Sequence, residues 1–235
     1  MHNSKLLKLL KILNATELKR LHQFLKSPFF NKNLHLLKLY QILRVWYPDF
    51  NSPKLEREKV FKKLFPDRAY DYQKLLNLMS DFTNLLKQYL QILQLEKEKQ
   101  VQDELLIKAY SKRSGAYDAF VKQIEKTKKE LDIQPFRNAD FFRQKFWINQ
   151  IFINHPKTDK FQLSSAKYNE MMQQLDYWFL LEKLLLSCEM KAREKPLSEK
   201  YEIWLLPEIQ KGVPSIFIEN PIFKVYLEML DTIQD

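Results

Sequence analysis

The sequence predicts an all-α fold, an irregular α-solenoid or helical bundle of antiparallel helix pairs with about ten helices. Two glycines, Gly115 and Gly212, occur in 235 residues, whereas average usage is about 7%. Glycine supplies the left-handed turns of hairpins and phosphate-binding loops, so its scarcity argues against an α/β enzyme. Leucine-rich stretches recur with helical spacing, and Ser, Thr, Asn or Asp precedes several of them as a cap.

The first 100 residues contain five predicted helices. Ser4 and Thr16 are predicted to cap the first two, and Ser52 followed by Pro53 is predicted to open the fourth. Prolines end the second, third and fourth helices, because the residue before a proline disfavours the helical conformation. The predicted ranges are 4–13, 16–27, 36–46, 53–64 and 71–93.

The remaining residues predict six further helical segments and one extended stretch, 216–218. The helix over 165–193 is apolar on more than one side, which is typical of a helix buried between neighbours. It is therefore expected at the centre of the C-terminal half, with Trp178, Leu181 and Leu185 almost fully buried. A bend at Pro207 is expected in the next helix. The predicted helical ranges are 105–110, 116–131, 140–154, 165–193, 198–210 and 221–233.

The charge divides the chain into two predicted domains. Residues 1–100 hold 19 Lys and Arg against 9 Asp and Glu, while residues 101–235 hold 20 of each. We therefore predict a basic N-terminal helical domain over 1–95 and a helical-repeat-like part over 96–235, which is expected to continue in a longer native chain. Within 1–95, residues 34–90 have the outline of a tri-helical DNA-binding unit. Its base-reading candidates are Gln73, Lys74, Asn77 and Asn84.

The chain lacks the motifs of common catalytic and metal sites. Its four histidines have no metal-ligand spacing, and no Walker loop, C-x-x-C or G-x-S-x-G occurs. Cys188 lies in an apolar helical stretch, where a structural thiol is more common than a nucleophile. We therefore predict a non-enzymatic protein without cofactor or metal. A single cysteine and the absence of a secretory or membrane-spanning segment predict a cytoplasmic location.

The basic N-terminal third has three interpretations. Its lysines can be the solvated backs of amphipathic helices, contacts to nucleic-acid phosphates, or contacts to an anionic membrane or acidic partner. Periodic Leu and Lys are equally expected of a bundle helix, so a membrane partner is not favoured. The candidate basic binding surface consists of Lys5, Lys8, Lys19, Arg20, Lys62 and Lys63.

The last predicted helix, 221–233, carries apolar residues on more than one face. The terminal helix of a solenoid normally has a polar outer side. We therefore predict that further helices, a second copy or a partner covers this helix. The candidate interface residues are Phe223 and Leu227.

Two stretches resemble a family of uncharacterised bacterial all-helical, helical-repeat (TPR-like) proteins. One is the segment 24–31 (FLKSPFFN) with Tyr47-Pro48 and Leu78-Met79-Ser80 downstream; the other is 175–178 (LDYW) with Lys183-Leu184 and Cys188-Glu189. The resemblance implies a helical-repeat fold and often longer chains, and it supplies no activity or catalytic residues.

Stacked helices form concave surfaces that bind peptides or partner helices. The expected function is therefore a non-enzymatic helical interaction module or scaffold that binds a protein partner or a second copy, with no small-molecule ligand implied. The alternative is a nucleic-acid-associated, regulatory protein that uses the basic N-terminal third.

Overall fold

The computed structural model describes residues 1, 3–159 and 163–234. Helices make up 72% of these residues, which contain no strand, and ten of the twelve helices have seven residues or more. The predicted all-α class is confirmed. Both glycines adopt positive φ angles, 82° at Gly115 and 148° at Gly212, which are conformations that side-chain-bearing residues rarely take.

The chain forms two compact units, Met1–Gln102 and Asp103–Asp235. The N-terminal unit carries 19 basic and 9 acidic side chains, and the C-terminal unit carries 20 of each. The charge asymmetry of the sequence therefore coincides with a division into units, which falls seven residues after the predicted boundary at residue 95.

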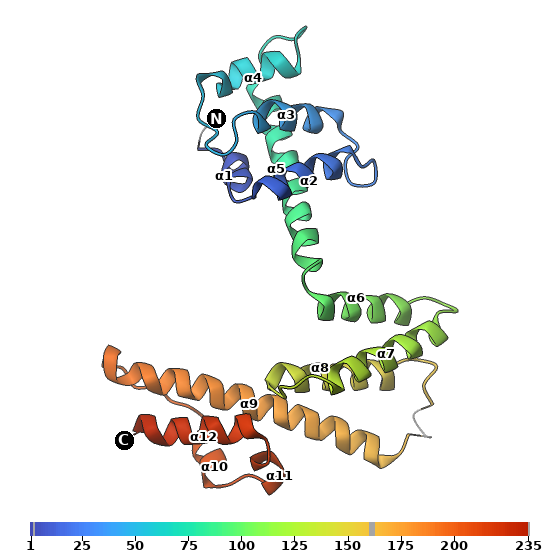
Figure 1. Ribbon diagram of the computed structural model, residues 1–235, viewed down its shortest axis with the longest axis vertical. Helices are drawn as coiled ribbons and strands as arrows, with labels where there is room; N and C mark the ends of the chain where they lie inside the picture. The colour runs from blue at the N-terminus through green and yellow to red at the C-terminus, as the bar shows by residue number, and fades with distance from the viewer. Residues whose placement is uncertain (2, 160–162, 235) are drawn as a thin grey trace. The chain divides into compact units, whose positions relative to one another are not determined.

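The N-terminal unit packs its helices around one apolar cluster (Figure 1). Leu7, Leu39 and Phe82 are fully buried in this cluster. Two tyrosines also anchor α2, because the hydroxyls of Tyr40 and Tyr89 each donate to a backbone carbonyl of that helix at 2.6 Å. Its elements are α1 (Lys5–Lys11), α2 (Ala15–Lys26), α3 (Leu34–Arg44), a 3-10 turn (Pro53–Leu55), α4 (Arg57–Leu64) and α5 (Tyr72–Leu95).

Caps explain where the first helices begin. The Ser4 hydroxyl accepts from the Leu7 amide, as predicted. The predicted cap Thr16 is wrong, because α2 begins at Ala15 and its cap lies two residues before Thr16. Its cap is Asn14, whose side chain accepts from the Glu17 amide at 2.9 Å while the Glu17 carboxylate accepts from the Asn14 amide at 3.0 Å. This reciprocal capping box satisfies two backbone donors at once, which a lone Thr16 hydroxyl could not do.

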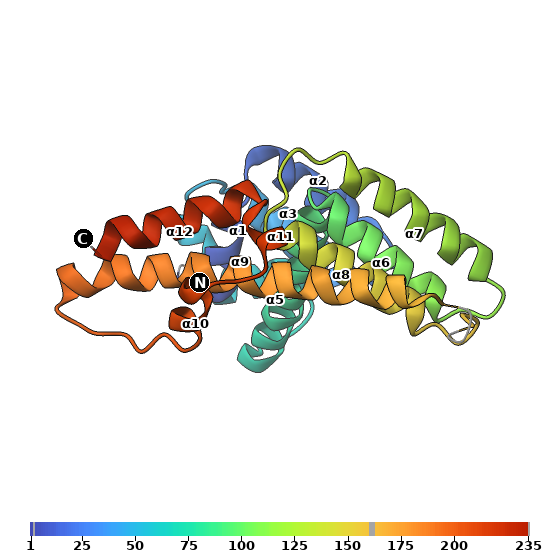
Figure 2. The same ribbon diagram turned by 90° about the horizontal axis from the view of Figure 1, so that it is seen from below.

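The C-terminal unit is built on the 33-residue helix α9 (Ser165–Leu197). In both views α8 lies beside the N-terminal part of α9 and α12 beside its C-terminal part (Figure 1, Figure 2). The other elements are α6 (Lys99–Ser111), which crosses the boundary between the units, α7 (Tyr117–Asp132), α8 (Ala139–Ile153), α10 (Leu206–Lys211), α11 (Ser215–Ile218) and α12 (Pro221–Gln234).

Three predictions for this unit are wrong. The helix expected over 198–210 is limited to Leu206–Lys211, because Pro207 lies in the first turn, where its missing N–H costs nothing. The stretch 216–218 is helical rather than extended. The side chain of Leu185 is 38% exposed and that of Trp178 is half-buried, so α9 is not enclosed on all sides.

Candidate interaction surfaces

The inner face of α9 holds the C-terminal unit together. Leu181 and Leu184 are fully buried, and Cys188 is buried one turn later. The Cys188 thiol donates to the Tyr226 carbonyl of α12 at 3.5 Å. Burial raises the pKa of this thiol, which keeps it protonated and unreactive near neutral pH. Cys188 is therefore a structural residue, as the sequence predicted.

Buried polar side chains fix the position of α9 against α8 and α7. The Asn149 amide of α8 donates to the Gln174 side chain of α9 at 2.8 Å, and Gln174 donates to Glu170 at 2.9 Å. On the other side, the Lys128 ammonium of α7 donates to the Asn149 oxygen. Burial lowers the pKa of Lys128. Because Asn149 joins Lys128 of α7 to Gln174 of α9, the network fixes one rotational setting of α9.

The opposite side of α9 exposes large apolar side chains. Met172, Phe179 and Leu186 recur every seven residues and are 52%, 46% and 54% exposed. Tyr168 and Leu175 each lie three or four residues from a member of this series. Residues with this spacing share one side of a helix, so the five side chains form one stripe. We call this set the outer stripe: Tyr168, Met172, Leu175, Phe179 and Leu186. The heptad spacing is the pattern by which one helix packs along another.

Charged residues lie on and beside the C-terminal half of the outer stripe. Glu182 and Glu189 continue the seven-residue series of Tyr168 and Leu175, and Asp176 and Lys183 each follow a position of that series by one residue. A shallow hollow of about 360 Å³ lies here and is lined by Phe179, Glu182, Lys183, Leu185, Leu186 and Glu189. The surface therefore offers an apolar stripe with charges of both signs along its edge.

The structure contradicts the predicted interface on the last helix. Phe223 is 0% exposed and packs in the core of the C-terminal unit, together with Leu230. Leu227 is half-buried against the same core. Their stripe faces α9, which provides within the chain the cover that we had expected from outside it. On α12 the exposed apolar side chains are Val225 and Met229.

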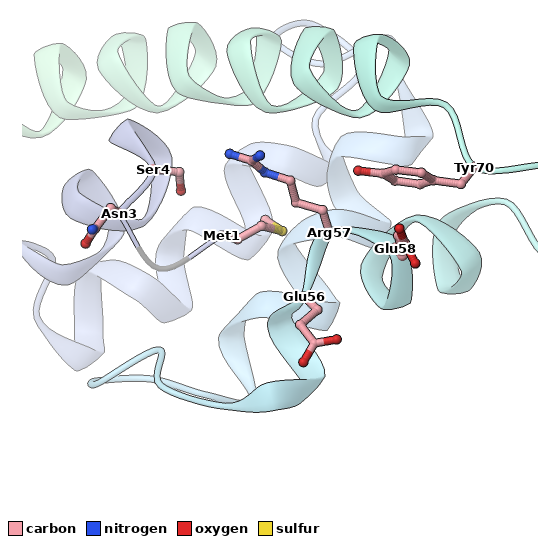
Figure 3. A pocket seen from close by; sticks show the side chains of 7 residues that line it. All are labelled: Met1, Asn3, Ser4, Glu56, Arg57, Glu58 and Tyr70. Atoms are coloured by element: carbon pink, nitrogen blue, oxygen red, sulfur yellow. The ribbon is translucent and has the colours of Figure 1, made fainter.

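In the N-terminal unit, hollows that share lining residues make up one surface groove, and α5 lines two of them. It consists of three adjoining hollows of about 760, 350 and 380 Å³. Ser4 and Arg57 line both the first and the second hollow, and Asn84 lines both the second and the third. In the first hollow the Arg57 guanidinium extends toward Ser4, while the Glu56 carboxylate points away (Figure 3).

The middle hollow is basic. Lys5 of α1, Arg57 of α4 and Lys87 of α5 line it, and no acidic residue is among its lining residues. Ser80, Thr83 and Asn84 supply polar groups on its α5 side, with the Thr83 hydroxyl donating to the Met79 carbonyl at 2.8 Å. Glu56 and Glu58 line the first hollow and Asp81 the third, so the positive charge is concentrated in the middle.

The structure brings only part of the predicted basic surface to this groove. Of the six candidates, Lys5 lines it. Lys8 and Lys19 are exposed on α1 and α2, and Lys62 and Lys63 are exposed at the end of α4. Arg20 forms a two-pronged ion pair with Glu96 at 2.8 and 2.9 Å, so much of its charge is neutralised locally.

Sequence reasoning missed Arg57 and Lys87 as partners of Lys5. Arg57 lies beside Tyr72, with its guanidinium 5.0 Å from the ring centroid and donating to the hydroxyl at 3.3 Å. Lys87 follows the predicted base-reading candidate Asn84 by three residues, so the helical spacing on α5 could have identified it. The association of Arg57 with Lys5 depends on tertiary packing and has no local signal.

The exposed face of α5 is rich in uncharged hydrogen-bonding side chains. Gln73, Asn77 and Asn84, three of the four predicted base-reading candidates, are exposed there, and Gln73 donates to Asn77 at 2.9 Å. The fourth, Lys74, is half-buried, with its ammonium 4.6 Å from the ring centroid of Phe65. Amide side chains pair with adenine edges in nucleic-acid complexes, and Ser80 and Gln91 extend the same face.

Comparisons with known proteins do not identify the chain: no family model, no curated protein and no solved structure matches it. The all-helical class fits the resemblance to bacterial helical proteins without confirming a family. Among the described residues, no cluster of three His, Cys, Asp or Glu side chains has the geometry of a metal site. In that same part of the chain, no helix combines the length and the apolarity needed to cross a membrane.

Proposed function

We propose that this protein is a non-enzymatic interaction module that docks another helix along the outer stripe of α9. The observation that supports this proposal is the seven-residue recurrence of exposed Met172, Phe179 and Leu186 on one face of a helix. Contiguous apolar surface on a protein in water marks an interaction site. An amphipathic partner helix would bury it by inserting side chains between successive stripe residues.

The rest of α9 supports the same proposal. Its inner face is fixed by buried leucines and by the network from Lys128 to Glu170. A partner would therefore meet a stripe that is already ordered, and binding would carry little cost for ordering the backbone of α9. Phe179 and Leu186 are the residues expected to contribute most, because Phe179 has the largest apolar ring of the stripe and Leu186 is its most exposed member.

A salt-resistant pull-down tests this proposal. The tagged chain is expected to retain a protein from cell extract, a second copy of itself included, in about 0.5 M salt, where exposed charge contacts are largely screened. Phe179→Glu combined with Leu186→Glu should abolish retention, because two buried carboxylates would replace two apolar contacts. Glu125→Lys, an exposed change on α7, is the matched control. Equal recovery with the stripe variant and the control would contradict the proposal.

A second candidate function is nucleic-acid binding by the N-terminal unit. The observation that favours it is the convergence of Lys5, Arg57 and Lys87 on one groove beside the amide-rich face of α5. A basic groove that tracks the phosphate backbone is one of the features by which proteins bind single-stranded nucleic acid. We propose it as an additional activity of a separate unit.

Salt dependence tests this second candidate. Replacing Lys5, Arg57 and Lys87 together by Gln should weaken binding of a single-stranded oligonucleotide. It should also reduce the slope of log K against log salt by about 2, because each lost phosphate contact contributes about 0.7. The matched control replaces Lys8, Lys19 and Lys62, which removes the same charge outside the groove. An equal effect of both triple variants, or no binding at about 50 mM salt, would exclude the groove as the site.

A further inference from the structure

We infer that the occupant of the outer stripe is a second copy of this chain, with the two α9 helices packed antiparallel across a two-fold axis. This inference rests on the proposed function, because it names the partner of the same surface. The order of charged residues beside the outer stripe supports it, because that order pairs opposite charges when the helix is reversed.

The apolar positions allow a register in which leucines of the two copies face each other. The seam of α9 contains two seven-residue series: 172, 179 and 186, and 168, 175, 182 and 189. In an antiparallel pair, a position of one series lies opposite a position of the other series on the second copy. When Leu175 lies opposite Leu186 of the second copy, Phe179 lies opposite the Glu182 of that copy, and the two-fold axis repeats both contacts. Leu175 of each copy therefore faces Leu186 of the other on either side of the two-fold axis. Between these two contacts, the aliphatic part of Glu182 covers the Phe179 ring of the other copy.

The flanking charges favour the same register. Asp176 follows Leu175 and Lys183 follows Glu182, so both lie on the same side of the line of contact between the two helices. In antiparallel pairs, side chains at this position of the two helices meet beside the apolar contacts. The register that pairs Leu175 with Leu186 places Asp176 next to Lys183 of the second copy, and the axis creates this opposite-charge pair twice. Both residues belong to the edge of the surface rather than to the core of the unit, so they are available for such a contact.

A parallel pairing of the same helices is unfavourable. It would place Glu182 against Glu182 and Glu189 against Glu189 at successive levels of the seam, and like charges at close range repel. The charge order of α9 therefore distinguishes an antiparallel second copy from a parallel one.

Sedimentation velocity with charge reversals tests the inference on the full chain. The wild type should form a dimer at loading concentrations up to about 100 µM, a range that detects weak interfaces of small buried area. Asp176→Lys and Lys183→Asp should each weaken the dimer about tenfold or more, because each creates two like-charge pairs across the axis. The variant that carries both changes again places opposite charges next to each other, with their positions exchanged. Its dimer dissociation constant should therefore lie within about threefold of the wild-type value.

Two further variants complete the design. Leu186→Glu should abolish the dimer while retaining the helical circular-dichroism signal, because Leu186 is exposed within its own unit. Glu125→Lys should leave dimerisation unchanged. A wild type that stays monomeric at about 100 µM, or a dimer that the double variant fails to restore, would overturn the inference. A salt-resistant pull-down of a different protein that still depends on Phe179 and Leu186 would then leave the proposed function standing.

Discussion

Replacing Phe223 by alanine is expected to destabilise the C-terminal unit by about 3–5 kcal/mol, the range for removing a buried phenyl ring. Phe223 is 0% exposed in the core formed by α8, α9 and α12. Truncation removes this apolar burial and leaves a cavity that the neighbouring leucines can fill only in part. Urea unfolding followed by circular dichroism measures the change.

The control for this prediction is Val225→Ala on the same helix. Val225 is 50% exposed, so its truncation should change the free energy of unfolding by about 0.5 kcal/mol or less. Comparable losses for both variants would mean that α12 does not present Phe223 to the core. A null result for Phe223→Ala would restore the original prediction that this residue belongs to an external surface.

The second large effect is expected at Leu181 of α9. Leu181 is 0% exposed, and Leu181→Ala should cost about 2–5 kcal/mol. Leu186→Ala, five residues further along the same helix, should cost about 0.5 kcal/mol or less in the monomer. The pair is measured at about 1 µM protein, where stabilisation by any association is small.

The contrast between these two leucines distinguishes the inner face of α9 from the outer stripe. A similar large loss for both would mean that Leu186 is packed within the chain, and the outer stripe would then be part of the core. A small loss for both would mean that α9 does not support the unit. Only the asymmetric outcome agrees with the contacts of α9.

The sequence allowed the fold class and most helices to be predicted, because those depend on local signals. The helices over 116–131 and 140–154 agree with α7 and α8 to within one residue at each end, since their apolar periodicity and flanking turn residues are near in sequence. Local competition explains the wrong cap at Thr16, where Asn14 and Glu17 together satisfy more backbone donors.

The candidate surfaces were harder to predict, because they depend on which apolar faces find partners inside the chain. The periodicity of α12 and that of α9 both indicate more than one apolar side. Phe223 packs inward, whereas Phe179 and Leu186 face outward. Neither outcome has a local signal. Likewise, Lys5 could be named from the sequence, but its neighbours Arg57 and Lys87 come from helices that only tertiary packing brings to it.

Photo-crosslinking in living cells tests most directly whether the outer stripe of α9 is a docking surface. A photoreactive amino acid is incorporated at position 186, and in parallel at position 125 on the exposed side of α7. We expect a discrete covalent adduct from position 186, with its attachment point on an apolar helix face of the partner or of a second copy, and none from position 125. No adduct from position 186, or the same products from both positions, would contradict it.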